Sequence, residues 1–120
     1  MFFHRMIIED DRQHTYTDAL EKCAQNNPQM IMCVVSNNNA DRYTAIKKKC
    51  YIDRAIPTQV MCQRTITPKG GNVRGLMSVG TKVAIQMNCK LGGAPWMIEL
   101  PLNGLMTIGF DVTRDVKDRN

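Results

Sequence analysis

Two different hydrophobic patterns, one periodic and one continuous, follow one another in the first third of the chain. The apolar residues of the first pattern have the i, i+3, i+4, i+7, i+8 spacing of one helical face: Tyr16, Ala19, Leu20, Cys23 and Ala24. This pattern predicts a helix over residues 14–25, which Asn26-Asn27-Pro28 ends. The next six residues, 30–35, are continuously apolar and bounded by polar residues, which predicts a strand buried on both faces, as in a parallel sheet.

The same alternation continues downstream. Asn39 is a suitable N-cap for a helix over 40–50, and Gly92-Gly93 is a suitable end for a helix over 76–91. Pro68, Gly70 and Gly71 indicate an exposed loop over 65–75. Further strands are expected at 58–63, 96–100 and 105–112. Strands that alternate with helices predict an α/β, Rossmann-like domain in which helices flank a small parallel sheet.

Ligands of such sheets bind beyond the carboxyl ends of the strands, which here points to the loop over 36–42. Tyr43 and Lys47, four residues apart, share one face of the helix that follows this loop. The free N–H groups and the dipole of that helix start favour an anion, and a tyrosine ring can stack on a base. From this pair alone, a half-buried tyrosine and a solvated lysine are the commoner interpretation.

A second row of polar residues runs along the helix over 76–91. Lys82, Gln86 and Lys90 are four apart and can point donors toward a neighbouring pocket, although lysines that border a core stripe are commoner. Gln59, at the start of a predicted strand, could reach the same pocket or be an ordinary edge amide. The spacing alone leaves both interpretations open.

The composition shows a net positive charge and argues against zinc sites, disulfides and membrane spans. The net charge is +5, and a basic cluster over 42–54 fits a phosphate-rich partner or a solvated face. The five cysteines contain no CxxC pair, which favours reduced, mostly buried thiols over zinc or disulfides. Residues 1–6 do not resemble a secretion signal, and no apolar run could span a membrane, so an intracellular protein is expected.

Three segments together resemble the MID domain of Argonaute proteins: residues 43–48, 57–60 and 82–93. The most specific of them is Asn88-Cys89-Lys90-Leu91-Gly92-Gly93, and Gly109-Phe110-Asp111-Val112 resembles the opening strand of the adjoining PIWI domain. The resemblance covers about 29–112 and implies a MID domain over 1–104 followed by the start of an RNase H-like PIWI domain over 105–120. Residues 1–11 carry no motif and are expected to be a strand of the preceding segment or simply an end of the fragment.

Gln86 makes the PIWI clade the closer match, because the microRNA-binding clade usually has a second lysine there. The resemblance implies that a divalent cation, Mg²⁺, offsets the missing charge and is held by Gln59 or Gln86. It also implies that the 5′-phosphate of a guide RNA is contacted by Tyr43, Lys47, Gln59 and Lys90. The first base, with uridine preferred, would be read by Tyr43 and by the loop residues Asn37, Asn38, Asn39, Asp41 and Arg42.

The resemblance further implies a role in piRNA-guided silencing of transposons in the germline, in cytoplasmic, perinuclear granules. The partners would be the 5′ end of a single-stranded piRNA and the rest of the PIWI protein in cis, with no membrane, and the fragment itself would be a monomer. The full protein would be a Mg²⁺-dependent RNA-guided endoribonuclease. Only the first of its carboxylates, Asp111, is present here, and a two-metal nuclease needs several, so the fragment is not expected to cleave RNA.

Two other functions compete with a guide-binding module. The fold class also suits an enzyme, either a nuclease or a protein that uses a mononucleotide, although fold does not determine function. The lysine run 47–49 also suits a non-specific basic RNA-binding or protein-interaction domain, whose binding would depend on salt but not on the chemistry of the RNA end.

Overall fold

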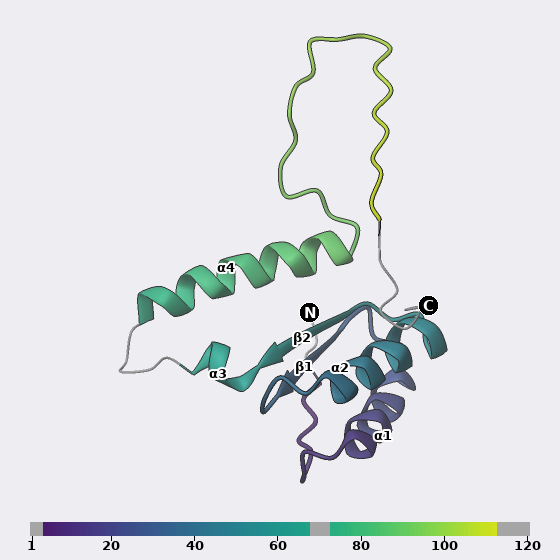
Figure 1. Ribbon diagram of the computed structural model, residues 1–120, viewed down its shortest axis with the longest axis vertical. Helices are drawn as coiled ribbons and strands as arrows, with labels where there is room; N and C mark the ends of the chain where they lie inside the picture. The colour runs from purple at the N-terminus through teal and green to yellow at the C-terminus, as the bar shows by residue number, and fades with distance from the viewer. Residues whose placement is uncertain (1–3, 68–72, 113–120) are drawn as a thin grey trace, which may run out of the picture.

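The computed structural model describes residues 4–67 and 73–112. Its two strands pair in parallel, with Ile31 opposite Thr58 and Val35 opposite Cys62, which confirms the α/β prediction (Figure 1). The elements, in chain order, are α1 (Gln13–Ala24), β1 (Ile31–Val35), α2 (Ala40–Lys47), the π-helical turn η1 (Lys48–Asp53), β2 (Thr58–Cys62), α3 (Gln63–Ile66) and α4 (Val73–Lys90).

The hydrophobic core lies between the sheet and the helices α1 and α2. Its buried members come from α1, β1, α2, η1 and the segment just before β2: Tyr16, Leu20, Ile31, Cys33, Val35, Ile46, Cys50 and Ile56. The helical face expected from the period of residues 16–24 is therefore the one that packs inward. Helix α4 lies on the opposite side of the strands from α1 and α2, so β2 is held between two layers of helix (Figure 1).

Strand β1 is buried on one face only, and the prediction of burial on both faces was wrong. Met32 and Val34 remain 47% and 44% exposed, while the residues between them face the core. Burial of both faces requires a cover on each side of the sheet. The polar contacts of α4 are made with Thr58 and Gln59 of β2, and the outer face of β1 stays open.

The helix expected over 40–50 changes its winding near its end. Asn39 caps it as predicted, because its Oδ1 accepts the N–H of Arg42 at 2.9 Å. After Lys47 the chain continues as the π-helical turn η1, and the Cys50 carbonyl accepts the N–H of Ile56 at 2.8 Å. Such turns are frequent at functional sites. This one leads the chain back to the start of β2.

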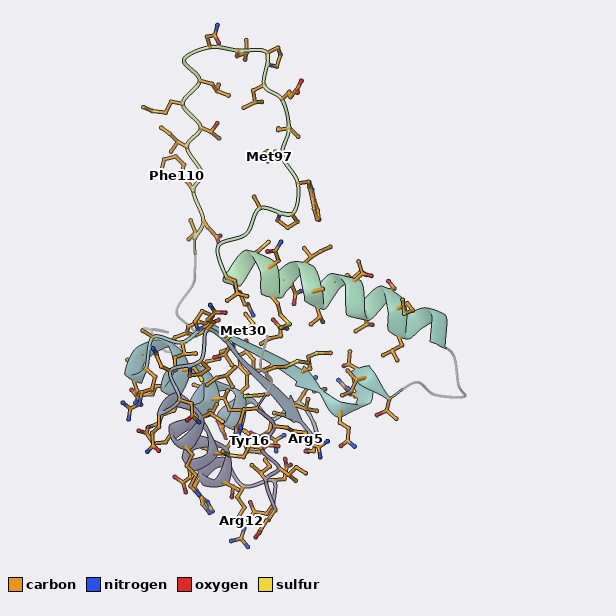
Figure 2. The ribbon with its side chains drawn as sticks, turned by 180° about the vertical axis from the view of Figure 1, so that it is seen from behind. Arg5, Arg12, Tyr16, Met30, Met97 and Phe110 are labelled. Atoms are coloured by element: carbon orange, nitrogen blue, oxygen red, sulfur yellow. The ribbon has the colours of Figure 1, made fainter. Side chains whose placement is uncertain are left out.

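The strands predicted at 96–100 and 105–112 are absent from the described residues. This part of the chain has no regular structure, and it runs away from the sheet and returns (Figure 1). Figure 2 shows Met97 and Phe110 on its two arms, where they are 88% and 91% exposed. A strand needs a ladder partner for its N–H and C=O groups, and neither arm has one within residues 4–67 and 73–112.

Two other expectations concern loops and ends. Residues 4–11 form no strand, although Ile8 packs against the core. The loop predicted over 65–75 begins instead inside the short helix α3, and residues 68–72 lie outside the described residues. Among the described helices none has the length and apolar character that crossing a membrane requires.

The cysteines are free, and their exposure predicts how they react. Cys33 and Cys50 are buried, Cys23 and Cys62 are half-buried, and Cys89 is exposed. Burial raises the pKa of the Cys33 thiol to about 12, and only a thiolate is a good nucleophile. Alkylation of the native protein near pH 8, followed by mass spectrometry, should therefore label Cys89 well before Cys33. Equal labelling of the two without denaturant would contradict this packing.

Candidate functional site

Two lysine ammonium groups converge on one backbone carbonyl. Lys47 Nζ, from α2, and Lys90 Nζ, from the end of α4, each donate to the carbonyl oxygen of Thr58 at 2.9 Å. Among the described residues, neither ammonium forms an ion pair with a carboxylate. Two like charges that share a neutral acceptor repel each other, and an anion between them would remove that cost. We call this group the two-lysine cluster.

The side chain of Gln59 connects this cluster to a second amide. Gln59 is 6% exposed, and its Oε1 accepts from Lys90 Nζ at 2.6 Å. Its Nε2 donates to Gln86 Oε1 at 3.2 Å. Three residues that the sequence analysis singled out, Gln59, Gln86 and Lys90, are thus hydrogen-bonded in one row.

Two tyrosine rings flank Lys47. Its Nζ lies 5.6 Å from the ring centroid of Tyr43 and 4.7 Å from that of Tyr51. The Tyr51 hydroxyl also lies 3.4 Å from both Lys47 Nζ and the Thr58 carbonyl. The sequence analysis missed Tyr51, although its spacing of four residues from Lys47 continues the face that begins at Tyr43.

A cavity of about 530 Å³ adjoins the two-lysine cluster. This volume is typical of small-ligand sites. Its walls are the loop 37–39, the first turns of α2, the strand β2, the start of α3 and Val83 of α4. Tyr43 and Gln59 belong both to this wall and to the contacts of the lysines. The two lysines could hold an anion, and the half-exposed ring of Tyr43 borders the cavity beside them. This arrangement suits a nucleotide, with its phosphate on the lysines and its base in the cavity.

The residues expected to read a base, except Asp41, line this cavity, and most of their polar groups are engaged. Asn38 Oδ1 accepts from the Cys62 thiol at 2.6 Å, and Asn39 caps α2. Asn37 accepts from Arg42 through its carbonyl and its side chain, and Arg42 is 4% exposed. Asp41 is exposed. The loop is therefore shaped by its own hydrogen bonds before any ligand binds.

Two further residues lie apart from the two-lysine cluster. Lys82 is exposed on α4, two turns before Lys90. Asp111 is exposed in the irregular segment over 94–112. The described residues contain no group of three or more His, Cys, Asp or Glu side chains that could hold a metal ion.

The fit of a magnesium ion to Gln59 and Gln86 depends on what else is bound. Amide oxygens are ligands that Mg²⁺ accepts. In this structure, however, both amide oxygens already accept N–H groups, and Lys90 lies against Gln59. A free Mg²⁺ would meet the positive charge of the two-lysine cluster. These residues therefore fit Mg²⁺ only together with an anion that offsets the lysines.

Much of the basic cluster over 42–54 is neutralised within the fold. Lys49 Nζ pairs with Glu21 at 2.7 Å, and Arg54 pairs with the same carboxylate. Arg42 pairs with Asp11. Fewer free cations remain than the sequence suggested, and this weakens the hypothesis of a non-specific basic surface.

Comparisons with known proteins agree on one family. Residues 30–120 match the Piwi domain family. Over 94% of its length the chain is 56% identical to Protein piwi of Drosophila melanogaster, and over 95% it is 48% identical to Piwi-like protein Siwi of Bombyx mori. It covers 13% and 12% of these two relatives. The crystal structure of Drosophila Piwi superimposes with a TM-score of 0.83 at 54% identity, over 93% of this chain and 15% of that one.

Proposed function

This chain belongs to the Piwi family of Argonaute proteins, and we propose that it holds the 5′ end of a single-stranded guide RNA. The 5′-monophosphate binds the two-lysine cluster, and the first base enters the adjoining cavity. One observation carries the proposal: Lys47 and Lys90 converge on the Thr58 carbonyl while neither has a carboxylate partner among the described residues.

The chemistry of a 5′-monophosphate matches this site. A terminal phosphate carries nearly two negative charges and three strong acceptor oxygens near neutral pH. Lys47 and Lys90 supply two positive charges, and the Gln59 amide supplies a further donor. The Tyr43 ring, which is 51% exposed, provides a surface on which the first base stacks. In this arrangement phosphate oxygens replace the Thr58 carbonyl as acceptors for the ammonium groups.

Magnesium enters this proposal as an auxiliary cation held with the RNA. Each internucleotide phosphate after the first nucleotide adds one more negative charge, and Gln86, unlike a lysine, adds no positive charge. The amide oxygens of Gln59 and Gln86 are the ligands that this chain offers to Mg²⁺. The ion would supply positive charge beside the phosphates.

In the longer protein to which we assign this chain, residues 1–104 form the MID domain and residues 105–120 begin the RNase H-like domain. The loop 37–39 meets the first base, with uridine preferred, and the RNA is a piRNA. Asp111 would then be one of several carboxylates of a Mg²⁺-dependent endoribonuclease. This chain contributes that residue and the guide-binding pocket but not the complete set that a two-metal reaction needs.

The test is a titration of the chain with a short single-stranded RNA that begins with uridine. The RNA carries either a 5′-phosphate or a 5′-hydroxyl, and each is measured in Mg²⁺ and in EDTA at fixed salt. We expect the phosphorylated RNA to bind more tightly, with a larger difference in Mg²⁺. Equal affinity for the two ends would refute a 5′-phosphate site in this chain. Binding that falls steeply with salt but ignores the RNA end would favour a non-specific basic surface.

A further inference from the structure

The segment before α1 reaches beneath the loop 36–39. The Asp11 carboxylate pairs with Arg42 and accepts hydrogen bonds from the hydroxyls of Ser36 and Tyr16. The backbone carbonyl of Asp11 accepts from Arg42 Nη1 at 3.1 Å. Figure 2 shows Arg12, the next residue, and Tyr16 at the start of α1. Asp11 thus contacts both Ser36, the first residue of the loop, and Arg42 in α2, the helix that follows the loop.

Arg42 links Asp11 to Asn37, the second residue of the loop. Its side chain is 5% exposed, and its Nη2 donates to the Asn37 carbonyl at 2.9 Å and to Asn37 Oδ1 at 2.7 Å. The guanidinium also lies 5.3 Å from the ring centroid of Tyr16. One buried cation therefore fixes both the backbone and the side chain of a residue that lines the cavity.

The charge state of this group is stable. The hydrogen bond from Ser36, followed by that from Tyr16, lowers the pKa of Asp11 to about 2. Burial, followed by the hydrogen bond to Asp11, raises the pKa of Tyr16 to about 12. Asp11 is therefore an anion and Tyr16 a hydroxyl donor throughout the pH range of a binding assay.

We propose that Asp11 and Arg42 are positioning residues for recognition of the first base. They hold the loop 36–39 in the shape with which it lines the cavity, Asp11 without itself touching the ligand. A loop that is ordered beforehand loses less conformational entropy when it binds and rejects ill-fitting bases more strongly. This inference rests on the proposed function, because it assigns a role within the same site.

The experiment compares two ratios for each variant of the chain. The first is the affinity for RNA that begins with uridine relative to RNA that begins with adenosine. The second is the affinity for phosphorylated relative to hydroxyl-ended RNA. Asp11→Asn should lower the first ratio by roughly two- to tenfold, the cost of ordering one more group on binding. It should leave the second ratio unchanged, because Lys47 and Lys90 are untouched.

Matched variants separate positioning from a loss of folding. Asp10→Asn alters the neighbouring carboxylate, whose hydrogen bonds and ion pair within the described part of the chain are with Arg12 and Thr15, and should change neither ratio. Tyr16→Phe removes the hydroxyl but keeps the ring over Arg42, and should lower the first ratio by a smaller factor. Asp11→Glu keeps the charge and should restore part of the discrimination.

The outcomes distinguish this inference from the function on which it rests. If the unaltered chain shows no phosphate preference, the proposed function fails. If it prefers phosphate but Asp11→Asn and Tyr16→Phe keep the full first-base ratio, the positioning role fails alone. A fall of both ratios by the same factor would also overturn it, because that result indicates a general loss of structure.

Discussion

Replacing Lys90 with alanine is expected to remove most of the preference for a 5′-phosphorylated RNA. Hydrogen bonds to charged groups contribute about 1.5–3 kcal/mol each, which corresponds to a loss of affinity of roughly 10- to 150-fold. Lys90 also donates to Gln59, so its removal leaves that buried amide without one of its partners. The measurement is the dissociation constant of phosphorylated and hydroxyl-ended RNA for each variant.

Lys47→Ala should lower the affinity for phosphorylated RNA by a similar factor, because Lys47 donates to the same Thr58 carbonyl as Lys90. In the proposed site the two lysines share one anion, so the double variant should lose less than the product of the single losses. Matched controls lie on the same helices or next to them. Lys48→Ala and Lys82→Ala remove the same charge from exposed positions and should lower both affinities slightly and equally.

Lys47→Ala should lower the affinity for phosphorylated RNA without lowering the free energy of unfolding of the free protein. In the free protein the two ammonium groups repel each other across one carbonyl, so Lys47→Ala should leave the melting temperature unchanged or raise it. Lys90→Ala relieves the same repulsion but leaves the buried Gln59 amide without one partner, so its melting temperature should lie below that of Lys47→Ala. Active sites commonly trade stability for binding in this way. A large fall of the melting temperature in Lys47→Ala would mean that this lysine is structural and would contradict the assignment.

The parts of this fold that depend on local pattern could be predicted from the sequence. The helical period of residues 16–24, the apolar run at 31–35 and the Asn39 cap each act over a few residues, and each is present in the structure. Lys47, Gln59, Gln86 and Lys90 were singled out by spacing and resemblance, and the structure brings their side chains together.

The features that were missed or misjudged depend on contacts distant in sequence or on a cover that pattern cannot reveal. Asp11 and Arg42 are separated by 31 residues, and nothing in the local sequence links an acidic residue before α1 to a later helix. The apolar residues of 96–112 have strand-like composition, but a strand forms only where a neighbouring backbone completes its hydrogen bonds. Met32 shows the same limit, because its hydrophobicity does not determine whether a helix covers it.

Tyr51 illustrates a third cause, a contact between a helical face and a strand that residue spacing does not reveal. A regular α-helix would also have placed it on the face of Lys47, and the π-helical turn keeps its hydroxyl within 3.4 Å of the Thr58 carbonyl. Composition alone could not distinguish this tyrosine from a solvent-exposed one. Its place beside Lys47 makes it a second ring, after Tyr43, next to the proposed phosphate site.

Gln86→Lys is expected to make binding of phosphorylated RNA nearly independent of magnesium. Gln86 Oε1 lies 3.2 Å from Gln59 Nε2, so an ammonium at position 86 would add its charge beside the phosphate. A charge-assisted hydrogen bond of about 1.5–3 kcal/mol would raise the affinity measured in EDTA by roughly tenfold or more. The comparison is the ratio of affinities in Mg²⁺ and in EDTA for the variant and the unaltered chain.

A neutral replacement supplies the control for this result. Gln86→Met has a similar length, no charge and no oxygen, so it should weaken the magnesium effect without raising affinity in EDTA. The third ammonium of Gln86→Lys should also lower the melting temperature of the free protein and increase the rise that phosphorylated RNA produces, because the anion then relieves more repulsion. If Gln86→Lys binds as magnesium-dependently as the unaltered chain, the cation does not act beside Gln86. The positive charge that accompanies the phosphate must then come from another part of the protein.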